Sequence, residues 1–76
     1  MIYIFDKYLP LRYRKIRRVT IERTFFKEFL SYRETLGYPV TEISEGIFQT
    51  DGYIYSERKV TMKKYLRNNK IKFKNR

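Results

Sequence analysis

The chain has 76 residues and contains neither cysteine nor histidine, so packing alone must stabilise its fold. Disulfide bonds and cysteine–histidine zinc sites, which support many small domains, are excluded. A chain this short forms one domain, and a domain of this size buries only about 60% of its unfolded surface. We therefore expect a single domain over residues 1–76 with a small core, no metal and no other cofactor.

Aromatic side chains supply much of the apolar material, because the sequence has eight tyrosines, six phenylalanines and no alanine. Such a sequence is too aromatic for a disordered chain, and the rings can serve either a core or a binding surface. The longest uncharged apolar run covers residues 1–5, far short of the about 20 residues that cross a membrane. With no secretory leader pattern visible, we expect a cytoplasmic protein without a membrane partner.

The net charge of +10 is unevenly distributed along the chain. Residues 1–33 carry nine basic and three acidic side chains, residues 34–57 carry five acidic and no basic ones, and residues 58–76 carry nine basic and no acidic ones. An excess of positive charge favours polyanionic partners. We expect the two basic arms to converge on one face; the alternative is that the acidic residues simply occupy exposed loops.

A β-hairpin is predicted by Asp51-Gly52 between two β-favouring runs. A two-residue loop pairs Thr50 with Tyr53, and a type I′ turn would need positive φ at both loop residues. One face of the hairpin must meet a helix, and the other is then exposed or covered by a partner, such as a second copy of the chain. The two faces consist of Phe48, Thr50, Tyr53 and Tyr55 on one side, and Ile47, Gln49, Ile54 and Ser56 on the other.

Three further segments favour extended structure. Residues 2–5 are apolar and predict a short buried strand, and residues 40–44 predict another. Residues 11–19 fit either an edge strand or an extended basic arm. Residues 70–74 alternate lysine with apolar residues, which predicts an edge strand, or a tail that orders on binding, with Ile71 and Phe73 inward.

A long amphipathic helix is predicted over residues 21–36, with Thr20 as its N-cap and Gly37 at its C-terminal end. A second, basic helix is predicted over residues 57–68, with Ser56 as its cap and with Met62, Tyr65 and Leu66 together on its apolar side. We therefore expect an α+β fold in which a small antiparallel sheet packs on one long helix, with a short basic C-terminal helix. The apolar arc of the long helix contains Ile21, Phe25, Phe26, Phe29, Leu30, Tyr32 and Leu36, and its three phenylalanines are expected to anchor the core.

No arrangement of residues typical of an enzyme is found. The three glycines are too dispersed for a phosphate-binding loop, and the acidic residues near the hairpin fit a solvated surface. We therefore expect a protein that is not an enzyme.

Two basic clusters are the candidate binding residues, because lysine and arginine neutralise phosphates and release counterions. Tyrosines beside them could stack on unpaired bases. Sheet aromatics with basic arms favour RNA over base reading in a DNA groove. The first basic cluster is Arg12, Arg14, Lys15, Arg17 and Arg18; the second is Lys63, Lys64, Arg67, Lys70, Lys72 and Lys74; the candidate stacking residues are Tyr13, Tyr53 and Tyr55.

The small size, the basicity and the abundance of Ile, Lys, Tyr, Phe and Asn resemble the small early proteins of T-even-like bacteriophages. The resemblance implies a phage-encoded inhibitor of a host defence or RNA-processing factor, such as an endoribonuclease toxin of a toxin–antitoxin system. RNA would bind the basic clusters, and Glu42, Glu45 and Asp51 could face a basic host protein. The alternatives are an inhibitor that clamps an acidic host protein, a DNA-binding regulator, or a basic segment at an anionic membrane surface.

Overall fold

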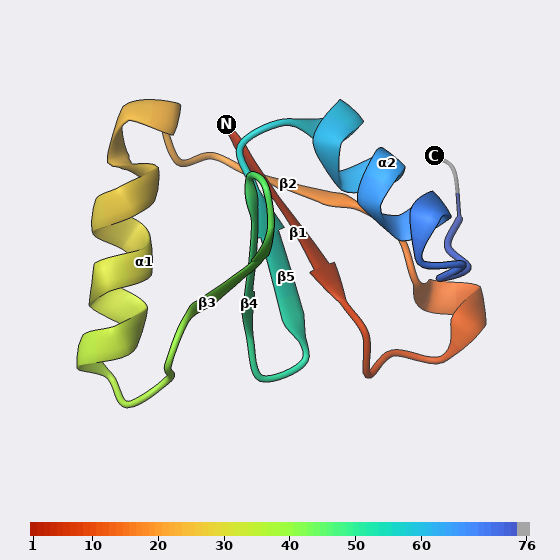
Figure 1. Ribbon diagram of the computed structural model, residues 1–76, viewed down its shortest axis with the longest axis horizontal. Helices are drawn as coiled ribbons and strands as arrows, with labels where there is room; N and C mark the ends of the chain where they lie inside the picture. Colours follow the sequence, from red (N-terminus) through yellow and green to blue (C-terminus); the bar gives the residue numbers. More distant parts are fainter. Residues whose placement is uncertain (75–76) are drawn as a thin grey trace.

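The computed structural model describes residues 1–74 and consists of a five-stranded antiparallel sheet between two helices (Figure 1). The strand order across the sheet is β2-β1-β5-β4-β3. The predicted α+β class with a small antiparallel sheet is confirmed. The elements in chain order are β1 (Ile2–Asp6), the 3-10 turn η1 (Leu11–Tyr13), β2 (Arg17–Val19), the 3-10 turn η2 (Arg23–Phe25), α1 (Phe26–Thr35), β3 (Thr41–Ser44), β4 (Ile47–Thr50), β5 (Tyr53–Ser56) and α2 (Lys59–Asn68).

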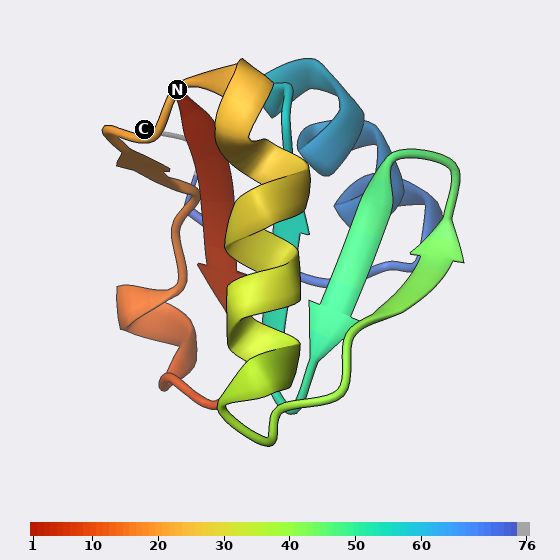
Figure 2. The same ribbon diagram turned by 90° about the vertical axis from the view of Figure 1, so that its left-hand side faces the viewer.

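Each helix covers one face of the sheet, and Figure 2 looks through α1 onto the strands, with α2 behind them. This arrangement explains why residues 2–5 of β1 are all apolar: Ile2 and Ile4 pack with the residues of α1, whereas Tyr3 and Phe5 pack with those of α2. The second face of the hairpin is therefore not exposed, because α2 buries Ile54 and its neighbours. That part of the prediction is wrong, and the reason for expecting a second copy on this face disappears.

The hairpin has the predicted register but a different turn. Thr50 pairs with Tyr53. Asp51 has a φ of 54°, whereas Gly52 lies outside the positive-φ region, so the turn is not type I′. Gly52 is needed instead because a Cβ atom there would overlap the ring of Tyr8. A hydrogen bond holds the Tyr8 ring over the turn, because the Tyr8 hydroxyl donates to Asp51 Oδ1 at 2.9 Å. This hydrogen bond raises the pKa of Tyr8.

Helix α1 is shorter than the helix predicted over residues 21–36, and with ten residues it is no longer than α2. Thr20 is not its N-cap, because the chain stays extended after β2 and turns into the helix only through η2. Ile21 packs with the apolar residues between sheet and helix instead of starting the helix. The predicted end is confirmed, since Gly37 adopts a φ of 92° just after the last turn.

Only part of the predicted apolar arc of α1 faces the sheet. Phe26 and Leu30 are buried, and Phe26 packs edge to face on Phe48 with ring centroids 5.5 Å apart. Phe25, by contrast, is 53% exposed, so its prediction as a core anchor is wrong. The physical reason is that the arc is too wide for one contact surface. The side of the arc that contains Phe26 packs against the sheet. Tyr32 and Leu36 lie on the other side of the arc and are exposed.

Helix α2 begins at Lys59, two residues later than predicted. Ser56 ends β5 instead of capping the helix, and its hydroxyl accepts a hydrogen bond from the backbone N–H of Arg58 at 3.2 Å. The predicted inward face is confirmed, because Met62 and Leu66 are fully buried against the sheet. The opposite side of the helix, which carries lysine and arginine, remains available for binding.

Candidate nucleic-acid interface

The first basic cluster begins in the loop after β1 and continues into an edge strand. Of the two structures predicted for residues 11–19, the edge strand is found in part, because β2 pairs with β1 at the edge of the sheet. Residues 11–13 form the 3-10 turn η1 and not an extended arm. Arg14 holds the loop together: it is half-buried, and its Nε donates to the carbonyl oxygen of Leu9 at 2.9 Å. Ile16 is buried in the core beneath α2 and anchors the segment to the sheet.

The second basic cluster turns back on itself after α2. Lys70 adopts the left-handed conformation, with a φ of 55°, and the backbone N–H of Ile71 donates to the carbonyl oxygen of Leu66 at 2.9 Å. As predicted, Ile71 and Phe73 point inward and the lysines between them are exposed. Phe73 packs edge to face on Phe5, with ring centroids 6.3 Å apart, so the C-terminal segment is tied to the core.

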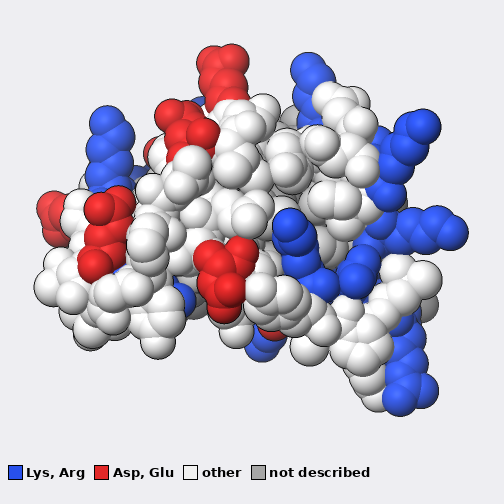
Figure 3. Space-filling view, turned by 60° about the horizontal axis from the view of Figure 1, so that its bottom comes forward, with Lys and Arg blue, Asp and Glu red and all other residues white. Residues whose placement is uncertain are grey.

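The two ends of the chain meet side by side. The backbone N–H of Lys74 donates to the carbonyl oxygen of Arg14 at 2.6 Å, and Lys15 and Lys74 form a parallel bridge. Residues 70–74 therefore make one bridge to the first arm instead of the predicted strand. This contact joins the two clusters into one area, which we call the basic surface. Figure 3 shows its lysines and arginines gathered over α2, the C-terminal segment and the loop before β2.

A groove lies where the two arms meet, with a volume of about 910 Å³. Its floor is apolar and its rim is basic. The first arm contributes Pro10, Leu11 and Arg12, and the second contributes Arg67, Ile71, Lys72, Phe73 and Lys74.

The eleven predicted basic residues differ in how far they are exposed and in whether they line the groove. Arg14 is partly occupied with Leu9 and is therefore in part a structural residue. Arg17 and Arg18 lie on the edge strand, opposite Ile4 and Tyr3 of β1, and not in the groove. The predicted residues that are exposed are Arg12, Lys15, Arg17, Arg18, Lys64, Arg67, Lys70, Lys72 and Lys74, while Lys63 is half-buried.

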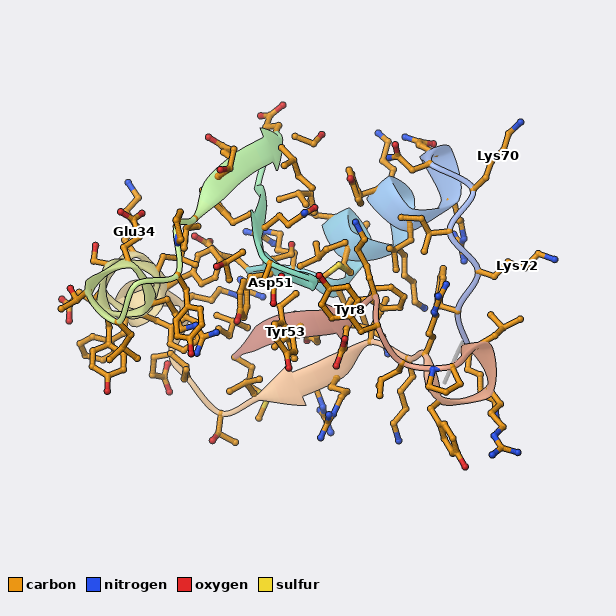
Figure 4. The ribbon with its side chains drawn as sticks, turned by 90° about the horizontal axis from the view of Figure 1, so that it is seen from below. Tyr8, Glu34, Asp51, Tyr53, Lys70 and Lys72 are labelled. Atoms are coloured by element: carbon orange, nitrogen blue, oxygen red, sulfur yellow. The ribbon has the colours of Figure 1, made fainter. Side chains whose placement is uncertain are left out.

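In Figure 3 the red acidic side chains lie on the left and in the middle of the molecule, whereas most of the blue basic side chains lie on the right. In Figure 4, Glu34 on α1 lies at the opposite end from Lys70 and Lys72. Glu42 and Glu45 are exposed near the β3–β4 turn, where Glu42 Oε2 accepts a hydrogen bond from the Gly46 N–H at 3.2 Å. The molecule is therefore dipolar.

The basic side chains are not neutralised by hydrogen-bonded carboxylates. Within residues 1–74, the hydrogen bonds to carboxylates come from backbone N–H groups and from the Tyr8 hydroxyl, and none comes from a lysine or arginine. The positive charge of the basic surface is thus available to an external anion.

One of the three candidate stacking tyrosines is well placed. Tyr13 is exposed in η1, and the guanidinium carbon of Arg12 lies 4.8 Å from the centre of its ring. Tyr55 is only 2% exposed and packs edge to face on Phe29 of α1. Its burial raises its pKa, and Tyr53 is half-buried in the same core. Tyr55 therefore lies in the core with no free face for a base, and Tyr53 packs against the core and is only partly exposed.

Comparison of the chain with protein-family models, with curated proteins and with solved structures finds no match. A function can therefore be inferred only from the sequence and from the geometry of the structure. Residues 1–74 contain no group of three or more acidic side chains placed to hold a metal ion. In the same part of the chain, neither helix combines the length and the apolar character needed to span a bilayer.

The groove floor was not predicted from the sequence. The alternation of residues 70–74 does place Ile71 and Phe73 inward, but it does not show what lies opposite them. Nothing in the sequence marked Leu11 as a binding residue, because a single leucine beside a proline is unremarkable in a loop. Only the return of the chain after Lys70 brings these residues together.

Proposed function

We propose that this protein is a non-enzymatic RNA-binding protein that holds the RNA backbone on its basic surface. The observation that carries the proposal is the backbone contact between Lys74 and Arg14, two residues 60 positions apart, which joins the two clusters into one surface. Phosphate neutralisation by clustered lysine and arginine releases counterions and provides affinity without reading sequence. Sequence specificity is accordingly modest.

Single-stranded RNA fits this surface better than duplex DNA. The argument from sheet aromatics is weakened, because Tyr55 is buried in the core and Tyr53 packs against it. In its place, Tyr13 is exposed among arginines in η1, and the groove beside it is open to solvent. An exposed ring next to phosphate-binding groups is the arrangement with which proteins stack unpaired bases.

The wider role that the composition implies is inhibition of a host RNA-processing or defence factor in the host cytoplasm. The uneven charge supports it, because exposed carboxylates at Glu42 and Glu45 lie near the β3–β4 turn, outside the groove. In this role the basic surface holds RNA, and the acidic end faces a basic protein such as an endoribonuclease.

The salt dependence of binding tests the proposal. Titration of a labelled single-stranded RNA should give an affinity that falls steeply with salt. If the four cations of the groove rim contact phosphates, the slope of log K against log salt is about −3. Matched single-stranded DNA and an acidic protein are titrated alongside. An affinity for RNA that is absent at low salt, or weaker than that for the acidic protein, would overturn the proposal.

A further inference from the structure

The groove differs from the rest of the basic surface because its floor is apolar. Leu11 is 51% exposed, and Phe73, with one edge packed on Phe5, also lines the hollow. A surface that only neutralised phosphates would gain nothing from such a floor, because phosphates remain hydrated and do not pack on hydrocarbon. The floor therefore points to a ligand that also has an apolar part.

Positive charge surrounds this floor from both arms. Arg12 belongs to the first arm, and Arg67, Lys72 and Lys74 belong to the second. None of the eight lining residues is acidic. A ligand seated on the floor thus lies between cations contributed by two separate segments, which favours an anion with charges on either side of an apolar group.

We infer that the groove seats an unpaired base of a single-stranded nucleic acid, with the flanking phosphates held by the cations of the rim. The inference rests on the proposed function and names its ligand. A base is flat and apolar on its faces, and within a strand each nucleoside is flanked by a phosphate on either side. In a duplex the bases are stacked on one another and cannot enter.

The dimensions of the groove agree with this ligand. Its volume of about 910 Å³ lies within the range of about 300–1,000 Å³ that small-molecule sites occupy. Pro10 and the ring of Phe73 are rigid apolar groups, which cost little entropy when a base packs on them. An acyl chain would need an enclosed apolar cavity, whereas this hollow is open to solvent.

The Leu11→Trp variant places a reporter in the floor. The chain has no tryptophan, and Leu11 lies in η1 outside both cores, so the change leaves the fold intact. Stacking of a base on the indole should quench its fluorescence by about half when short oligouridylate is added. Inorganic polyphosphate, which has the charge but no bases, should bind without quenching. The control is Leu36→Trp, at a 50% exposed leucine just after α1 that does not line the groove, and it should not respond.

A second variant measures the contribution of the floor to affinity. Leu11→Ser should weaken oligouridylate binding about tenfold and change polyphosphate binding by less than about twofold. Leu36→Ser, at an equally exposed leucine outside the groove, should change neither.

The outcomes separate the inference from the proposed function. Oligouridylate that binds the wild-type protein without quenching Leu11→Trp, or with unchanged affinity for Leu11→Ser, overturns the inference and leaves RNA binding in place. Tighter binding and stronger quenching by a peptide of glutamate and phenylalanine also overturns it. Failure of the wild-type protein to bind any nucleic acid overturns the proposed function and the inference together.

Discussion

The double variant Lys15→Glu/Lys72→Glu should lose RNA binding by about 100-fold or more while keeping its fold. The two lysines come from opposite ends of the chain and are both exposed. Each reversal removes one attraction and adds one repulsion at the centre of the basic surface. Because neither side chain is buried, the free energy of unfolding should change by less than about 0.5 kcal/mol each.

The matched control is Arg23→Glu/Lys27→Glu, at the α1 end. It lowers the net charge by the same four units, and both residues are exposed. Salt screens charges over about 8 Å at physiological ionic strength, so this control should weaken RNA binding by less than about threefold. Affinity is measured by fluorescence anisotropy, and folding by thermal melting. An equal loss in the two double variants would mean that net charge alone attracts RNA and that no defined surface exists.

The Phe26→Ala variant should have the largest effect on stability. Phe26 is 1% exposed and contacts Phe48 between α1 and the sheet. Removing a buried phenylalanine ring costs about 3–5 kcal/mol. A domain of 76 residues has a total stability of roughly 4–11 kcal/mol. The variant should therefore lose from about a quarter to all of the stability of the domain and unfold at a much lower urea concentration.

The neighbouring Phe25→Ala variant is the control, because its ring is 53% exposed. It should change the free energy of unfolding by less than about 0.5 kcal/mol. The midpoints of urea unfolding are measured for both variants and compared with that of the wild-type protein. Similar losses in the two variants, or a larger loss at Phe25, would contradict the orientation of α1.

The sheet was the most predictable part of the fold. Local patterns determine it: the register of Thr50 with Tyr53 follows from a two-residue loop, and the apolar β1 follows from burial on both faces. The reason for Gly52 was not predictable. It depends on Tyr8, which lies more than forty residues away and carries no local signal.

The helices show where sequence periodicity is insufficient. In α1 the apolar arc included both Phe25 and Phe26, and only tertiary packing determines which of them enters the core. In α2 the apolar residues Met62 and Leu66 form a narrower arc than that of α1, so the helix can bury its apolar side in only one orientation. The predicted face is confirmed. A wide apolar arc thus predicts a helix well but its orientation poorly.

The candidate site was predictable in its charges and not in its shape. Runs of lysine and arginine are visible in any sequence, and the structure places them on adjoining segments. The groove floor needs the reversal at Lys70 to bring Phe73 toward Leu11. The spacing of residues in the sequence does not predict such a contact.

Amide chemical-shift mapping is the most direct test of the claim that both ends of the chain form one RNA-binding surface. Single-stranded RNA is titrated into isotope-labelled protein, and the shift of each backbone amide is followed. We predict changes concentrated in residues 11–18 and 63–74, with α1 and β3 unaffected. Changes confined to one arm, or centred on α1 and β3, would contradict the account.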